Sequence, residues 1–189
     1  PSLVRSLISF MSTHINSRDP KYSTPAHEAA KAFQQTPMQD DEEGKLDRIV
    51  TAFRDFYSGR PRFPVNEEYV RRYAKGMIEA ENRVGDSPRL VGALMKARPF
   101  PDEDLSQIRA PFLAIHGTHD PLVNIRCAFH TVRTIPGGRL MAIDGMGHDM
   151  VSPRIFPLLA ETMDHHAKTS PPIWLRDGLD APREGEADY

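Results

Sequence analysis

The strongest constraint on the fold lies between residues 111 and 143, where two short apolar segments flank one helix-length segment. Residues 112–116 and 139–143 are apolar runs that end at turn-forming residues, as buried strands do. Residues 125–134, between them, are expected to form a helix. Strands and helices that alternate with short turns predict parallel strands joined by right-handed crossovers, and hence an α/β fold.

The residues before 111 follow a different pattern, which predicts one strand and then an inserted group of helices. Residues 3–11 alternate in part and predict a strand. Apolar spacing and capping residues predict helices over residues 26–35, 46–56, 67–77 and 88–95. A last helix is expected after residue 150. The expected divisions are a core strand (1–12), a helical insertion (13–108), a β-α-β-α unit (109–167) and a disordered tail (168–189).

Charge and composition exclude several classes of protein. The 24 lysines and arginines against 26 aspartates and glutamates give a net charge of −2, without the basic excess of a nucleic-acid-binding protein. Mean hydropathy is −0.49, and no apolar run approaches the roughly 18 residues of a membrane-spanning helix. We therefore expect no nucleic-acid partner, no membrane association and a cytoplasmic location. The one cysteine, Cys127, excludes an internal disulfide and is expected to be buried.

The residues that carry chemistry lie just after the two strands of the β-α-β-α unit. Asp120 follows the first of these strands, and His148 follows the second, 28 residues later. Because catalytic groups gather at the carboxyl ends of parallel strands, these two side chains are expected to meet at one edge of the sheet. Gly145 and Gly147 beside the histidine are expected to give its loop unusual backbone angles. A carboxylate beside an imidazole fixes its tautomer and stabilises its protonated form, so Asp120 and His148 are the candidate acid and base.

These two segments resemble a known family. His-Gly-Thr-His-Asp-Pro at 116–121 and Gly-Met-Gly-His at 145–148 are similar to the acid and base motifs of the α/β-hydrolases. With the Ile-Pro-Gly turn at 135–137, they resemble the aclacinomycin methylesterase-like esterases in particular. The resemblance covers residues 1–167. It implies a partial α/β-hydrolase fold, with three C-terminal parallel strands, flanking helices and an inserted helical cap. It also implies Asp120 as acid, His148 as base, a small apolar ester-like substrate and no cofactor.

The chain departs from that family at the nucleophile. Neither Gly-x-Ser-x-Gly nor Gly-x-Cys-x-Gly occurs in its 189 residues. We therefore expect a fragment that begins after the nucleophile and is inactive alone. Three alternatives stay open: a serine nucleophile on the missing part, an aspartate there as in dehalogenases and epoxide hydrolases, or a non-catalytic binding remnant. The first strand would then have an open edge, which predicts self-association.

Two other groups of residues are candidates for a functional site. His116, His119 and His148 would offer three metal ligands, but their strand-end spacing differs from known zinc motifs, so no metal site is expected. An aromatic group in the insertion is expected to form its core and to line part of an apolar substrate pocket. Its members are Phe53, Phe56, Tyr57, Tyr69 and Tyr73.

Overall fold

The centre of the computed structural model is a sheet of three parallel strands. They are β1 (Leu7–Phe10), β2 (Phe112–Gly117) and β3 (Arg139–Ile143), in the order β1-β2-β3. The structure describes residues 4–14, 20–36, 41–57, 65–84, 101–148 and 153–170. All three strands and their parallel arrangement were predicted. β1 is shorter than the expected 3–11, and its ladder is flanked by the Leu7 N–H bond to Pro111 and the Met11 N–H bond to Ile115.

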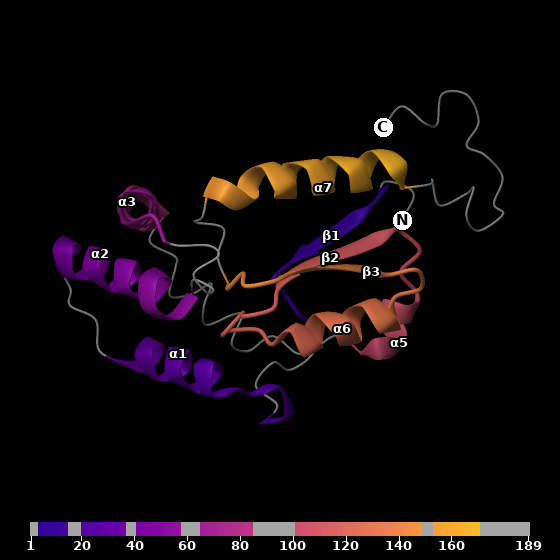
Figure 1. Ribbon diagram of the computed structural model, residues 1–189, viewed down its shortest axis with the longest axis horizontal. Coiled ribbons are helices and arrows are strands. Elements are labelled where there is room, and N and C mark those ends of the chain that lie inside the picture. Colours follow the sequence, from indigo (N-terminus) through magenta and orange to yellow (C-terminus); the bar gives the residue numbers. More distant parts are fainter. Residues whose placement is uncertain are drawn as a thin grey trace.

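Helices cover both faces of this sheet (Figure 1). α6 (Ile125–Thr134), which connects β2 to β3, lies on one face, and α7 (Phe156–Thr169), which follows β3, lies on the other. Even-numbered side chains of β2 face α6, and odd-numbered ones face α7. On the α6 side the buried residues are Phe112, Ala114, Ala128 and Ile135. On the α7 side they are Leu113, Ile115, Ile143, Met146, Ile155 and Leu159.

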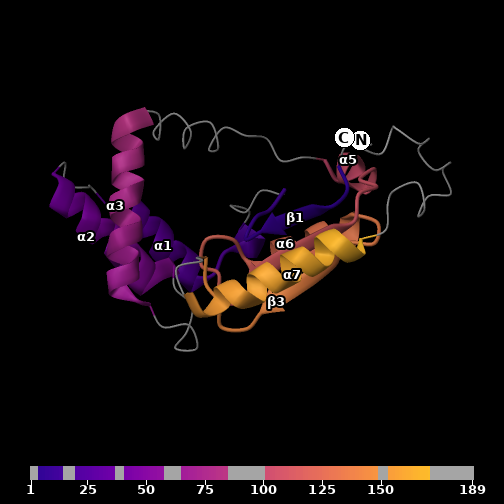
Figure 2. The ribbon, with the colours of Figure 1, turned by 90° about the horizontal axis from the view of Figure 1, so that it is seen from above.

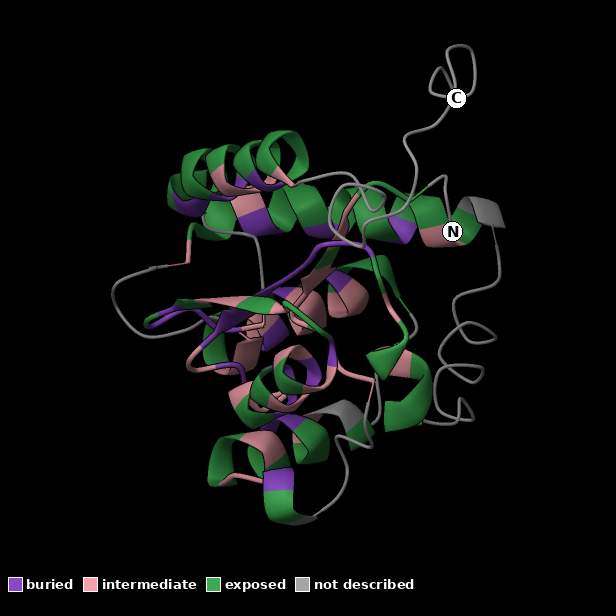
Figure 3. Ribbon diagram, turned by 90° about the vertical axis from the view of Figure 1, so that its right-hand side faces the viewer, coloured by how far each residue is buried: buried purple, intermediate pink, exposed green. Residues whose placement is uncertain are grey.

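β2 is the most deeply buried element of the sheet. All six of its residues are buried (Figure 3), because it is paired on both edges and covered on both faces. β1 pairs only with β2 in the described part of the chain, so it is an edge strand there, as expected. Ile8 at that edge is 36% exposed, whereas Ile115 in β2 is completely buried.

The helical insertion joins β1 to β2. It contains α1 (Pro25–Gln35), α2 (Glu42–Thr51) and α3 (Glu67–Val84), with the π-helical turn Ala52–Tyr57 after α2 and the short α5 (Asp102–Ser106) at its end. The predicted caps are present: the Thr24 hydroxyl accepts from His27 N–H at 3.1 Å, and Asn66 Oδ1 accepts from Tyr69 N–H at 3.0 Å. The helix expected over 88–95 lies outside the described residues. α5 was not predicted, because it is only five residues long.

The insertion has a small core of its own. α2 and α3 pack through the buried residues Leu46, Val50, Val70, Ala74 and Ile78. Of the predicted aromatic group, Phe53 and Tyr69 pack against this core, whereas Tyr73 is 45% exposed and lies edge-to-face with Phe53, with 5.8 Å between the ring centres. Figures 1 and 2 show α1, α2 and α3 gathered at one end of the sheet, where the strands end.

The last helix extends slightly beyond its expected end. α7 runs to Thr169, past the expected boundary at 167, and residues 171–189 of the expected tail lie outside the described residues. Among the helices that the structure describes, none has both the length and the apolar character needed to cross a membrane.

Because β2 is more deeply buried than β1, the same isoleucine-to-alanine substitution should lower the free energy of unfolding by different amounts in the two strands. Ile115→Ala removes a completely buried side chain from the centre of the sheet, so it should lower the free energy of unfolding by about 2–5 kcal/mol. Ile8→Ala, at the exposed edge, serves as the matched control and should cost less than about 1 kcal/mol. Urea unfolding followed by circular dichroism measures both, and equal losses would contradict the described burial.

Candidate active site

The loops after β2 and β3 touch each other at Gly117. A Cβ at this residue would lie 2.1 Å from the carbonyl oxygen of Met146 and 2.7 Å from that of Gly147. Two backbone hydrogen bonds join the loops here: Thr118 N–H donates to the Ile143 carbonyl at 3.1 Å, and His119 N–H donates to the Met146 carbonyl at 3.0 Å. Only glycine permits this approach, so the residue at 117 sets the distance between the two loops.

The histidine loop turns sharply after β3. Gly145 has a φ of 80°, as expected for a glycine in this turn, and its N–H donates to the Thr118 hydroxyl at 3.0 Å. Gly147 does not adopt a positive φ. Gly147 instead presents its carbonyl oxygen close to Gly117.

The Asp120 carboxylate is held from the backbone on one side. Its Oδ1 accepts hydrogen bonds from the N–H groups of Leu122 and Val123, both at 2.8 Å. The side chain is completely buried, so no water competes for these bonds. This local turn orients the other oxygen, Oδ2, toward the histidine loop.

Two histidines contact that second oxygen. His148 Nδ1 lies 2.8 Å from Asp120 Oδ2, so the predicted acid and base meet at the edge of the sheet. His116 Nε2 lies 3.2 Å from the same oxygen and 2.8 Å from the carbonyl oxygen of Val123. Because a carbonyl oxygen only accepts, His116 Nε2 carries a hydrogen, which removes this nitrogen as a metal ligand.

The sequence predicts no structural role for His116, which is considered there only as a possible metal ligand. The available signal was its position: an imidazole in a buried apolar strand, four residues before an aspartate, needs a polar partner. His119, the other strand-end histidine, lies beside the Thr118 hydroxyl, with 2.8 Å between Nδ1 and Oγ1. It therefore lies next to the carboxylate loop and has no described contact with Asp120.

Opposing influences act on the pKa of Asp120. Burial is the largest of them and acts to raise it. The hydrogen bonds from His116 and His148, together with the positive charge of a protonated His148 and the Val123 N–H, favour the charged form. Their combined effect is larger, so the pKa of Asp120 lies below its ordinary value. Asp120 is therefore a carboxylate at neutral pH and accepts hydrogen bonds through both oxygens.

This carboxylate decides the tautomer of His148. Since Asp120 Oδ2 can only accept, His148 Nδ1 must donate, and the lone pair of the neutral ring is then on Nε2. The His148 side chain is 28% exposed, whereas the side chain of its acid partner is completely buried. The pair has the arrangement that a general base needs.

The helical insertion contacts the histidine loop directly. His148 N–H donates to the carbonyl oxygen of Tyr57, the last residue of the π-helical turn, at 2.8 Å. The amide of Asn124 donates to the Tyr22 carbonyl at 3.0 Å, and the rings of Tyr69 and Phe156 lie 6.1 Å apart. The insertion is therefore joined to both sides of the sheet and to the candidate base.

Cys127 is no candidate nucleophile in this arrangement. It is completely buried on α6, as expected, and burial raises the pKa of its thiol above the ordinary value. The reactive thiolate form is therefore disfavoured.

Comparison of the sequence with protein-family models and with curated proteins finds no match. Comparison of the structure does find similar folds. An esterase from Rhodococcus sp. ECU1013 superposes with a TM-score of 0.57 at 17% identity, over 87% of this chain and 56% of that protein. The 2-hydroxy-6-oxo-6-phenylhexa-2,4-dienoate hydrolase from Rhodococcus sp. strain RHA1 gives 0.55 at 15% identity, over 87% and 55%. A hydrolase from Pseudomonas aeruginosa PA01 gives 0.55 at 19% identity, over 87% and 56%.

The chain carries part of the α/β-hydrolase fold. It spans little more than half the length of these solved structures. Its three parallel strands and flanking helices match them over that part, which confirms the partial α/β-hydrolase fold expected from the sequence. At these identities the likeness concerns the fold. The roles of Asp120 and His148 stay predictions, supported by their geometry.

Gly117→Ala should separate the two loops of this partial α/β-hydrolase fold. The new Cβ meets backbone atoms, which cannot rotate away, so the free energy of unfolding should fall by about 1–3 kcal/mol or more. Gly76→Ala is the matched control, because a Cβ there meets nothing within 4 Å on helix α3. That variant should be stabilised by about 0.5–1 kcal/mol. Urea unfolding compares them, and a neutral Gly117→Ala would disprove the close approach.

The lowered pKa of Asp120 predicts a pH-dependent contribution to stability. A carboxyl with a lower pKa in the folded state stabilises the protein above its unfolded-state pKa, and this stabilisation disappears as the pH falls through the folded-state pKa. Asp120→Asn should therefore lower the free energy of unfolding by about 1–3 kcal/mol at pH 7, and by progressively less below about pH 4. Asp164→Asn, at an exposed carboxylate paired with Lys168, should leave the free energy of unfolding almost unchanged both at pH 7 and below about pH 4. Urea unfolding across this pH range measures both, and a constant loss for Asp120→Asn would contradict the assignment.

Proposed function

We propose that this chain supplies the acid and the base of a carboxylic-ester hydrolase. The observation that supports the proposal is the 2.8 Å bond between Asp120 Oδ2 and His148 Nδ1, at the carboxyl ends of adjacent parallel strands. In this role His148 Nε2 takes the proton from a nucleophile as it attacks the ester carbonyl, and later returns it to the leaving alcohol. Asp120 orients the imidazole and stabilises its positive charge.

The ester class is proposed on two grounds. The motifs at 116–121 and 145–148 resemble those of esterases, and one of the similar structures is an esterase. The other two structures named above are hydrolases, one of a different compound and one of an unstated compound, so they support hydrolysis as the chemistry. A small apolar ester-like compound is the proposed substrate.

The helical insertion is proposed as a cap over this site. Its π-helical turn ends at Tyr57, whose carbonyl oxygen accepts from the His148 N–H. A cap in this position limits the water that reaches the base and provides apolar side chains, such as Phe53 and Tyr57, for an acyl or alcohol group.

The nucleophile is proposed to lie on a segment outside these 189 residues. The sequence contains no Gly-x-Ser-x-Gly, and the chain spans little more than half the length of the similar hydrolases. The chain alone is accordingly proposed to be inactive. A non-catalytic binding module is the second candidate, favoured by the same missing motif, and an aspartate nucleophile would change the reaction to that of a dehalogenase or epoxide hydrolase.

Hydrolysis of p-nitrophenyl esters tests these proposals. We expect the 189-residue chain to release p-nitrophenol no faster than buffer. A longer form that includes an upstream in-frame Gly-x-Ser-x-Gly should be active. Asp120→Asn in that form should lower turnover about 10⁴-fold although the protein, destabilised as described above, stays folded at the assay temperature. His165→Ala, at an exposed histidine of α7, is the control and should keep wild-type turnover.

Other outcomes separate the alternatives. Turnover by the short chain that is lost on His148→Ala would place a nucleophile within these residues. An upstream sequence with an aspartate in the elbow position would replace the ester proposal by one of the other two reactions. The absence of any elbow upstream would favour the binding module.

A further inference from the structure

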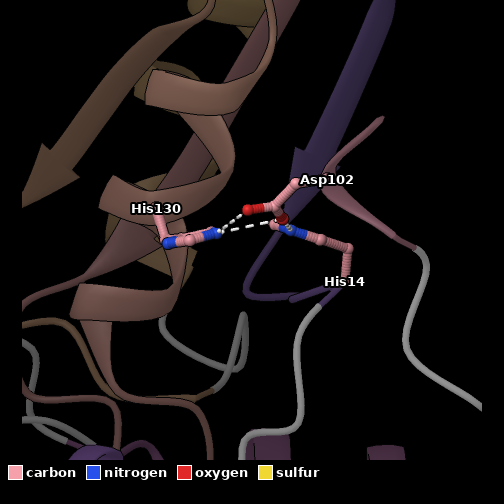
Figure 4. Close-up of side chains that lie close together, drawn as sticks. All are labelled: His14, Asp102 and His130. Carbon is pink, nitrogen blue, oxygen red and sulfur yellow. Dashed lines mark hydrogen bonds and ion pairs between the residues drawn. The ribbon is translucent and has the colours of Figure 1, made fainter. Parts of the chain in front are cut away.

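A second cluster of ionisable side chains lies away from Asp120 and His148. His14, Asp102 and His130 come from three distant parts of the sequence, and Figure 4 shows both imidazoles turned toward the one carboxylate. His14 follows β1, Asp102 begins α5, and His130 lies in the middle of α6. Neither the proposed reaction nor the packing of the sheet accounts for this convergence.

The spacing of the three side chains matches that of metal ligands. His14 Nε2 lies 3.1 Å from Asp102 Oδ1, and His130 Nε2 lies 3.0 Å from Asp102 Oδ2. One ligand atom from each residue lies within 4.8 Å of the others. Ligand atoms about 2.1 Å from one cation are roughly 3.0–3.4 Å apart at octahedral or tetrahedral angles. The two nitrogen–oxygen distances fall in this range, and the three ligand atoms, all within 4.8 Å of one another, have to close around a common centre to bind one cation.

The hydrogen bond on the far side of His14 fixes its tautomer. His14 Nδ1 lies 2.9 Å from the Thr131 hydroxyl, and that hydroxyl donates its single hydrogen to the Cys127 carbonyl at 2.9 Å. His14 Nδ1 must therefore donate, and the neutral ring directs the lone pair of Nε2 at Asp102. A lone pair facing a carboxylate is repulsive unless a proton or a metal ion lies between them, and metal-binding histidines are held by the same kind of second bond.

The exposure of the cluster also suits a bound ion. His14 is almost completely buried, whereas Asp102 and His130 are partly exposed, so an ion held by the three residues keeps a side open to water. Two imidazoles and one carboxylate form a donor set typical of Zn²⁺ and of neighbouring divalent transition metals, rather than of Ca²⁺ or Mg²⁺.

We propose that His14 Nε2, His130 Nε2 and the Asp102 carboxylate bind one divalent transition-metal ion, with Zn²⁺ as the best fit. This site goes beyond the metal-free expectation from the sequence and shares no residue with the proposed acid–base pair. His14 and Asp102 are 88 residues apart and lie at the two ends of the helical insertion. The ion would thus link both ends of the insertion, at His14 and Asp102, to α6 and restrain the insertion there.

Titration of the full 189-residue chain with Zn²⁺, after removal of any affinity tag, tests the site. Isothermal calorimetry should give one high-affinity site per chain, and Zn²⁺ should raise the melting temperature. Asp102→Asn and His130→Ala, both at partly exposed positions, should each weaken Zn²⁺ binding about tenfold or more and remove most of the thermal shift. Thr131→Val, which removes the bond to His14 Nδ1, should weaken binding to a smaller extent.

Controls make the test specific. His165→Ala should bind Zn²⁺ as the wild type does, since this exposed histidine is outside the cluster. Co²⁺ should give a visible absorption band that is lost in Asp102→Asn, whereas Ca²⁺ should give no thermal shift. Circular dichroism checks that each variant is folded. Unchanged Zn²⁺ affinity in both Asp102→Asn and His130→Ala, or no Zn²⁺ binding by the wild type, would overturn the proposal. The cluster would then be held together by hydrogen bonds alone.

Discussion

The contact between two strand-end loops at Gly117 is the constraint on which the candidate site depends. No side chain fits there, because the Met146 carbonyl oxygen occupies the position that a Cβ would need. The loops are therefore close enough for backbone hydrogen bonds and for the bond between Asp120 and His148. A separation larger by even 1 Å would leave a buried carboxylate without one of its partners, which is costly in a site that excludes water.

The second organising interaction is the pairing of β1 with β2. These strands are adjacent in the sheet although the whole helical insertion separates them in the sequence. Because the two strands are parallel, the end of β1 and the start of β2 lie at opposite ends of the sheet, and the insertion has to return along the sheet before β2 begins. α1, α2 and α3 lie at the carboxyl ends of the strands (Figure 2), where the Tyr57 carbonyl meets the histidine loop. The segment after β1 and the start of α5 meet beside α6, which places His14 next to Asp102 and His130.

Burial and hydrogen bonding together determine the state of the acid. Asp120 is completely buried, which by itself would favour the neutral form, but two backbone N–H groups and two imidazoles act on its oxygens. The charged form prevails, so the direction of the bond to His148 follows. The hydrogen bonds that keep Asp120 charged thus also determine the tautomer of the proposed base, His148. His116 contributes one of these hydrogen bonds, although its own side chain is not exposed to a reactant.

The local sequence determined the elements and the candidate pair. Apolar runs and caps predicted three strands, the helices that begin after Thr24 and Asn66, and the positions of Asp120 and His148 after adjacent strands. It did not predict α5, the π-helical turn, the part played by His116 or the His14–Asp102–His130 cluster. Patterns along the chain report on neighbours a few residues apart, and the pairs His14–Asp102 and His148–Tyr57 are joined across long stretches. Only the packing of the insertion against the sheet and its helices brings such groups within hydrogen-bonding distance, because the partners are far apart in the sequence and no local preference joins them.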